Sequence, residues 1–293
     1  MEEPDPEKDP RAYEQFHKDM AAWDAEGSVD SVKPPLVIKP IFGCEVYFTP
    51  DDTLSRDKKP ELYHMVLFAR NQTGYVNLMQ TVSEAAVDGF YYKPRVTLDN
   101  LRRHREGLIA SSACIAGIIP KMIDRGDLPR ALEWAETFRD LFEPGCFYIE
   151  IQEHGITTDS GMTDEQMDRQ LIEIAKQIGV KVIATNDFHY LTRDDAPVQD
   201  VMMCIGMNSK VDDPNRMRMQ GSEFYMKSED EMRAMFPYCP EACDNTVELA
   251  EKCDVELDWD SIILPNYPLL DPGETHESQF RREGEEGRGG GEG

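Results

Sequence analysis

Two polar side chains stand two residues apart, just after a short apolar stretch. Asp187 and His189 follow residues 180–184, whose β-branched and apolar side chains are typical of a buried strand. On an extended backbone, residues i and i+2 point the same way, so this carboxylate and imidazole could bind one cation. In β/α barrels, polar residues past the C-terminal end of a strand often carry the chemistry. The structural alternative is that Asp187 caps the next turn and His189 is a partly buried loop histidine.

Three further polar residues lie at or near expected strand ends: Glu45, His64 and Cys114. With Asp187 and His189 they offer carboxylate, imidazole and thiolate ligands, which suit zinc or manganese and could hold more than one ion. Only the last two have the spacing of a local metal site, so the fold must bring the others to them. Each of the three has an ordinary alternative, as a solvent-facing strand residue, a hydrogen-bonded core histidine and a small buried apolar residue respectively.

A few other residues merit a chemical interpretation. His154 follows Glu153 and an expected strand at 147–151, so it could support the same site. Cys239 and Cys243 have helical spacing but no second ligand pair nearby, which favours a structural role. The sequence contains no Gly-x-Ser-x-Gly motif, and its glycine-rich end has neither the helix nor the Lys-Ser/Thr of a phosphate loop.

Alternating strand and helix patterns would position these residues. Strands are expected near 38–48, 62–69, 107–111, 147–151 and 180–184, and helices near 75–86, 97–104, 114–123, 128–141 and 163–178. Thr163 and Gln166 form a capping box at the start of the last of these helices. The alternation predicts an α/β architecture with parallel strands. Beyond residue 190 the pattern changes to helices and loops, with helices expected at 196–207, 229–236 and 241–253.

Composition limits the classes of function. The 293 residues suffice for one large or two modest domains, and the net charge is −26 with a pI near 4.5. Such an acidic surface repels phosphate backbones, so we expect weak or no DNA binding by these residues themselves; it suits a cation-binding protein or a scaffold. Seven scattered cysteines are typical of reduced cytoplasmic thiols. No apolar run of about 18 residues and no secretion signal occurs, so we expect a cytoplasmic protein without a membrane span.

Eight long stretches occur in a fixed order along the chain. Five are IKPIFGCEVYFTP, YHMVLFARNQTGYVNLMQTVSEA, GLIASSACIAG, FYIEIQEHG and IATNDFHYLTRDDA. Three more are DDPNRMRMQGSEFYMKSEDEM, PEACDNTVELAEKCDVEL and ILPNYP. The first five resemble the PHP domain of bacterial DNA polymerase III alpha subunits. The last three resemble the segment that joins this domain to the polymerase palm, and the resemblance covers roughly residues 37–280.

The resemblance implies an incomplete, distorted seven-stranded β/α barrel that lacks its first strands, with divalent metal at the strand ends. On the matching motifs, the family's metal-ligand positions fall on Glu45, His64, Cys114, Asp187 and His189. His154 is a candidate supporting residue. The family's opening His-x-His motif and its Asp-His-Gly motif do not occur in this sequence, so part of the ligand set is missing.

The resemblance also implies a domain order and a function. We expect a flexible lead-in at 1–36, a partial PHP domain at 37–192, a helical junction at 193–268 and a truncated, low-complexity tail at 269–293. The chain would be an internal fragment of a replicative DNA-directed DNA polymerase, a nucleotidyltransferase that works with magnesium in its palm. Its partners would be DNA, a proofreading exonuclease and a sliding clamp.

We expect no catalytic residue in the fragment and no activity of the fragment alone. In some family members the PHP domain is similar to a 3′–5′ exonuclease or phosphoesterase. Two alternatives remain open: a free-standing PHP phosphoesterase of the histidinol-phosphatase type, and a non-catalytic scaffold for a proofreading subunit.

Overall fold

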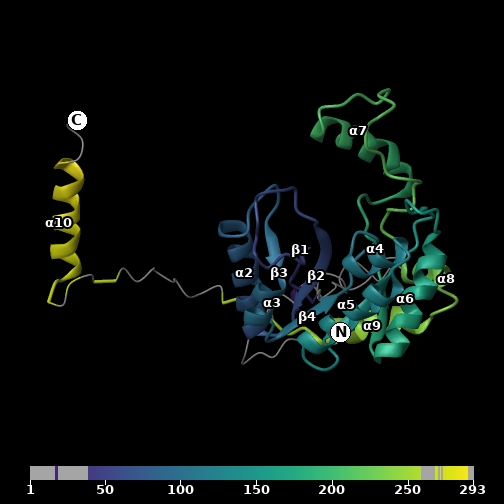
Figure 1. Ribbon diagram of the computed structural model, residues 1–293, viewed down its shortest axis with the longest axis horizontal. Helices are drawn as coiled ribbons and strands as arrows, with labels where there is room; N and C mark the ends of the chain where they lie inside the picture. The colour runs from purple at the N-terminus through teal and green to yellow at the C-terminus, as the bar shows by residue number, and fades with distance from the viewer. Residues whose placement is uncertain (1–16, 19–38, 259–267, 270, 272, 290–293) are drawn as a thin grey trace. The chain divides into compact units, whose positions relative to one another are not determined.

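The computed structural model describes residues 17–18, 39–258, 268–269, 271 and 273–289 (Figure 1). The expected lead-in at 1–36 therefore lies outside the described residues, apart from His17 and Lys18. The chain divides into two compact units, one up to Val255 and one from Glu256 onward.

A six-stranded sheet forms the centre of the first unit, in the order β3-β1-β2-β4-β5-β6. The strands are β1 (Gly43–Thr49), β2 (Tyr63–Ala69), β3 (Arg95–Thr97), β4 (Leu108–Ser111), β5 (Phe147–Ile151) and β6 (Lys181–Ala184). The sheet is open, with β3 and β6 at its edges. A mixed α/β fold with an open sheet agrees with the predicted incomplete barrel.

The prediction of parallel strands is wrong for β2. This strand runs antiparallel to both of its neighbours, β1 and β4, whereas the β1–β3, β4–β5 and β5–β6 pairs are parallel. The reason lies in residues 50–62, which contain no helix, so the chain returns after β1 without the crossover that a parallel neighbour requires. As a result, the N-terminal end of β2 lies beside the C-terminal ends of its neighbours β1 and β4.

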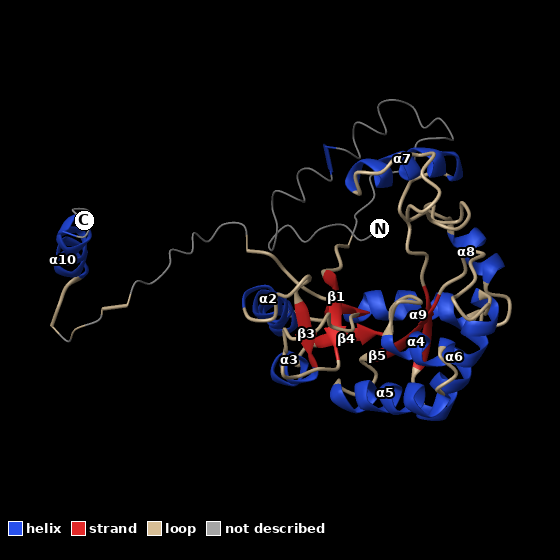
Figure 2. Ribbon diagram, turned by 45° about the horizontal axis from the view of Figure 1, so that its top comes forward, coloured by secondary structure: helices blue, strands red, loops and turns tan. Residues whose placement is uncertain are grey.

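Helices flank this sheet, except α7, which lies apart from it (Figure 2). The helices are α2 (Gln72–Val87), α3 (Leu98–His104), α4 (Ile118–Asp124), α5 (Leu128–Leu141), α6 (Asp164–Ile178), α7 (Ala196–Gly206), α8 (Glu229–Met235) and α9 (Glu241–Lys252), with a 3-10 turn η1 (Arg193–Asp195) before α7. The predicted capping box of Thr163 and Gln166 opens α6, and Gly179, in the left-handed conformation at φ 72°, ends it. The helix expected from Cys114 begins only at Ile118, so Cys114 lies in a turn.

The core lies on the face of the sheet that the helices cover. In β2, Tyr63, Met65 and Leu67 are buried, while the alternating residues are only partly buried on the other face. Phe48 of β1 packs edge-on against Phe138 of α5, with ring centroids 5.3 Å apart. Burying one such aromatic side chain contributes about 1.5–3 kcal/mol. In β1 and β2 one face thus packs in the core and the other is available for polar residues, whereas β4 and β5 are buried on both faces.

The second unit contains α10 (His276–Gly289), where the sequence predicts a low-complexity tail. Local interactions account for this helix. The Thr275 hydroxyl accepts a hydrogen bond from the Ser278 backbone N–H at 3.2 Å, and Arg281 pairs with Glu277 one turn away at 3.1 Å. Residues 290–293 lie outside the described residues. Among the helices that the structure describes, none is both long and apolar enough to cross a membrane.

Candidate metal centre

Three of the predicted ligands, Glu45, His64 and Cys114, lie together beside the N-terminal end of β2. They are called the strand cluster. Their ligand atoms all lie within 4.8 Å of one another. His64 Nδ1 is 3.3 Å from Glu45 Oε1 and 3.5 Å from Cys114 Sγ. Bonds of roughly 2.0–2.3 Å to a tetrahedral zinc ion place neighbouring ligand atoms about 3.3–3.7 Å apart. The donor set and the two distances from His64 therefore fit a zinc-sized ion.

Strand register brings Glu45 and His64 together. In the β1–β2 ladder, Glu45 pairs with Val66 and Tyr47 pairs with His64. Glu45 and His64 are therefore diagonal neighbours on the same face of the sheet. This is the less buried face, so both side chains keep access to solvent, with 48% and 28% of their surfaces exposed. A register slip of one residue would turn one of them to the opposite face.

A tight turn at residues 112–117 brings in Cys114. The His64 backbone N–H donates to the Ala116 carbonyl at 3.0 Å, which docks the turn on β2. Ala113 adopts a left-handed conformation with φ 58°, which costs free energy for a residue other than glycine. Gly117 leaves no room for a side chain, because a Cβ there would lie 2.1 Å from the Ser112 carbonyl oxygen. The thiol is thus held by a constrained backbone.

Hydrogen bonds set the protonation of the strand cluster. The bond to Cys114, with the bond to Glu45, raises the pKa of His64 to about 10 against the opposing effect of burial. The bond from His64 lowers the pKa of the Glu45 carboxyl, and the positive charges of His64 and His189 lower it further while burial opposes them. Without metal at neutral pH, the cluster therefore holds an imidazolium beside a carboxylate. A metal ion would have to displace that proton.

Asp187 and His189, called the loop pair below, follow β6 as predicted. His189 Nε2 lies 3.5 Å from Asp187 Oδ1, and about two fifths of each side chain is exposed. Asp187 has a left-handed backbone, with φ 41°. The charge of His189 helps to lower the pKa of the Glu45 carboxyl. The loop pair is not part of the group whose ligand atoms lie within 4.8 Å of one another.

His154 lies beneath the loop pair. It is 3% exposed, and its Nε2 donates to the Asn186 carbonyl oxygen at 2.7 Å. Its ring stacks on Phe224 with centroids 4.3 Å apart. Burial lowers the pKa of His154, so the ring stays neutral at neutral pH. His154 therefore contacts the backbone that precedes Asp187.

A buried acid that was not predicted from the sequence lies close to these strand ends. Glu150 of β5 is 5% exposed and accepts hydrogen bonds from Ser111, Thr185 and the Gln152 side chain. Burial raises the pKa of this carboxyl. A charged residue inside the apolar run FYIEI is the signal that could have identified it, because a buried charge needs partners. Its three partners hold together the ends of β4, β5 and β6.

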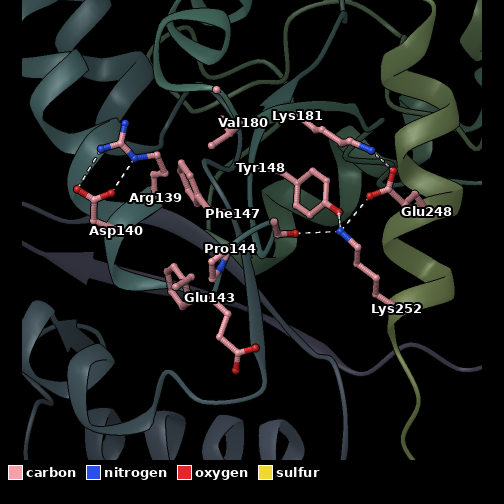
Figure 3. A pocket seen from close by; sticks show the side chains of 13 residues that line it. Arg139, Asp140, Glu143, Pro144, Phe147, Tyr148, Val180, Lys181, Glu248 and Lys252 are labelled. Carbon is pink, nitrogen blue, oxygen red and sulfur yellow. Dashed lines mark hydrogen bonds and ion pairs between the residues drawn. The ribbon is translucent and has the colours of Figure 1, made fainter.

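A cavity of about 580 Å³ lies at the opposite ends of β5 and β6, away from the predicted ligands (Figure 3). Apart from Glu143, which pairs with Arg70, its charged side chains pair with one another. Lys252 donates to the Tyr148 hydroxyl at 2.7 Å and pairs with Glu248 at 2.9 Å, and Lys181 pairs with the same carboxylate. These ion pairs join the start of β6 to α9. The ion pairs stabilise the packing of neighbouring elements, and none of the predicted ligands lines the cavity.

Comparisons with known proteins agree with this architecture. The family model described as PHP domain matches residues 10–154. The chain is 38% identical over 235 residues to the DNA polymerase III subunit alpha of Treponema pallidum and 40% identical over 237 residues to that of Borreliella burgdorferi, covering 79% of this chain in each case. It is 38% identical over 260 residues, 84% of the chain, to that of Thermus aquaticus. The chain spans about a fifth of the length of these relatives. Residues 10–154 therefore match the PHP domain, and over the aligned residues the chain is similar to DNA polymerase III alpha subunits.

Proposed function

We propose that this chain provides the PHP domain of a replicative DNA polymerase and that this domain binds a divalent metal ion at its strand ends. The convergence of Glu45, His64 and Cys114 within 4.8 Å carries the proposal. Asp187 and His189 would supply further ligands from the neighbouring loop. His154 would support that loop through its hydrogen bond to Asn186.

The donor set favours zinc over manganese. Thiolate and imidazole ligands suit zinc, whereas manganese prefers carboxylate, carbonyl and water oxygen. When bound, such an ion would lower the pKa of a water molecule and orient a phosphate ester, which is the chemistry of phosphoesterases and 3′–5′ exonucleases. The chain's own contribution is to hold the ligands: the β1–β2 register fixes Glu45 and His64, and the 112–117 turn fixes Cys114.

The activity proposed for the whole protein is DNA-directed DNA synthesis, a nucleotidyl transfer with magnesium in a palm domain. The printed name of the relatives, DNA polymerase III subunit alpha, supports this. DNA, a proofreading exonuclease and a sliding clamp would be the partners, and the bacterial cytoplasm the location. We expect no primed-template extension by the 293 residues, because they span about a fifth of those relatives, and little or no nuclease activity. Extension by the purified chain would refute the first of these expectations.

A free-standing phosphoesterase is the second candidate. The relatives align over 79% of the chain, which is more than the match to the PHP domain model. This favours the polymerase subunit, since a small phosphatase has no need of the helical region after residue 190. If the domain bound no metal, it would instead be a scaffold for a proofreading subunit.

Metal content tests the proposed site. The purified chain is treated with chelator, supplied with zinc or manganese, dialysed and measured by elemental analysis. We expect bound zinc in the wild-type chain and its loss in Cys114→Ser. Cys44→Ser is the matched control, because Cys44 is next to Glu45 in β1 but pairs with Leu67 and points to the opposite face. A wild-type chain that retains neither metal would contradict the proposal and favour the scaffold.

A further inference from the structure

The loop pair is held by a segment far along the chain, residues 223–227, called the clamp below. The His189 backbone N–H donates to the Phe224 carbonyl at 2.8 Å, and the Met226 N–H donates to the Tyr190 carbonyl at 3.1 Å. Tyr190 and Tyr225 form an isolated parallel β-bridge. The clamp therefore pairs with the loop as a short strand would. It belongs to the region that the sequence assigns to the junction and not to the PHP domain.

Asn186 is the centre of these contacts. Its Oδ1 accepts a hydrogen bond from Lys227 Nζ at 2.9 Å, its Nδ2 donates to the Tyr225 carbonyl, and its own carbonyl accepts from His154. The next residue, Asp187, has the left-handed backbone that a non-glycine residue rarely adopts. Such a conformation persists where the surroundings fix it. The three bonds of Asn186 supply that fixation immediately before the ligand.

Lys227 is buried with its charge, since only 1% of its side chain is exposed. Burying an ammonium group is costly unless it is paired and hydrogen-bonded. Its partners are Asn186 Oδ1, the Glu223 carbonyl and the Glu223 carboxylate at 3.8 Å. The cost of burying this lysine is therefore offset by contacts within the clamp and to the residue before Asp187.

Phe224 adds an apolar contact on the same side. Its ring stacks on His154 at an angle of 9° and meets the His189 ring edge-on, with centroids 5.9 Å apart. The aromatic side chain thus lies against both histidines of this loop region and limits the positions open to the His189 imidazole.

We propose that Asn186 and Lys227 are positioning residues for the loop pair, so that the junction region fixes the second half of the metal site. The inference rests on the proposed metal site for its chemical meaning, but the positioning itself can be measured without metal. If the clamp sets the loop, removing the Lys227 ammonium takes away one of the three bonds of Asn186 and loosens the amides that pair with the clamp. If the β-strands alone set it, those amides are unaffected.

Hydrogen exchange of the metal-free, full 293-residue chain tests this directly. In Lys227→Met we expect the His189 and Met226 amides to exchange roughly tenfold faster or more, because their bonds cross the clamp. The Thr185 amide, which donates to Ile151 between β5 and β6 at 3.1 Å, should not change. Lys252→Met is the matched control, since this lysine pairs with Glu248 at the other end of the sheet. Unchanged exchange at His189 and Met226 would overturn the inference.

Asn186→Ala provides a second variant should Lys227→Met fail to fold, and the same two amides are expected to respond. Unfolding of both variants would assign these residues to global stability and would also overturn the inference.

Cobalt binding then tests whether the position of the loop pair affects metal affinity. We expect Lys227→Met to retain the thiolate–cobalt absorption of Cys114 and to lose roughly tenfold in affinity. A wild-type chain that binds no cobalt would refute the metal site while leaving the exchange result valid.

Discussion

The strand cluster and the loop pair carry similar ligands but are assembled in different ways. Glu45 and His64 are set by the register of two paired strands, and Cys114 is set by a turn with no room for a side chain at Gly117. Asp187 and His189 are close in sequence, yet their loop depends on contacts with residues 223–227. A sheet holds distant ligands rigidly, whereas a pair that is local in sequence still needs distant support.

This difference predicts that the strand cluster dominates metal affinity. His64→Ala removes the ligand that contacts both Glu45 and Cys114, so we expect zinc affinity to fall by more than the roughly 10–100-fold that loss of a supporting residue costs. Titration calorimetry with zinc measures the change. His104→Ala is the control, because His104 pairs with Glu84 outside the cluster. Equal zinc affinities of wild type and His64→Ala would show that the strand cluster is not the metal site.

The rigidity of the Cys114 turn can be tested by adding one methyl group. Gly117→Ala places a Cβ against the Ser112 carbonyl, and we expect a loss of about 1–3 kcal/mol in the free energy of unfolding. Urea denaturation measures it. Gly206→Ala is the control, because a Cβ at Gly206 meets nothing within 4 Å. Equal losses in the two variants would mean that the turn is not constrained as described.

Metal binding should depend on pH through His64. The pKa of this residue is raised to about 10, so between pH 6 and pH 8 the metal-free cluster holds a proton that the ion must displace. Zinc affinity should therefore rise with pH, by up to about tenfold per pH unit for that one proton. Calorimetry at several pH values measures the slope. A slope that His64→Ala leaves unchanged would assign the displaced proton to another group.

The same shift affects stability in the opposite direction. Because the folded-state pKa of His64 lies above its ordinary value of 6.5, the protonated ring stabilises the metal-free fold below pH 6.5. That contribution is lost as the pH rises through about 10. Thermal melting between pH 6 and pH 10 should show a decline that is smaller in His64→Ala. An identical decline in the variant would contradict the assignment.

The loop pair should contribute least to affinity. Asp187→Asn keeps the size of the side chain and removes its charge, and we expect roughly a tenfold loss of zinc affinity while the strand cluster stays intact. Calorimetry beside His64→Ala gives the ratio of the two effects. A loss larger than that of His64→Ala would reverse the comparison and place the main site on the loop.

Local patterns predicted the parts of the molecule that local interactions determine. The capping box of Thr163 marked the start of α6. Asp187 and His189 do lie together after β6, but Asp187 has a left-handed backbone and not the extended one that the spacing argument assumed. The direction of β2 could not be predicted from its own residues, because it depends on whether the preceding connection crosses the sheet. The residue spacing after Cys114 is typical of a helix. The hydrogen bond from His64 to Ala116 instead holds residues 112–117 in a turn, and the helix begins at Ile118.

The residues that support the loop pair could not be predicted from the sequence for a different reason. Asn186, Phe224 and Lys227 acquire their roles only when residues 223–227 pair with the loop after β6. No periodicity marks such a contact, since it is a single bridge between irregular segments. The ligand positions, by contrast, were proposed from strand ends and from the resemblance to the PHP domain.

X-ray absorption at the zinc edge of the loaded chain shows which atoms surround the ion. We predict one sulfur neighbour at about 2.3 Å, from Cys114, together with nitrogen and oxygen neighbours at about 2.0–2.1 Å, and the same sulfur signal in the control variant Cys44→Ser. A bound zinc ion surrounded by nitrogen and oxygen only would contradict the strand cluster as its site.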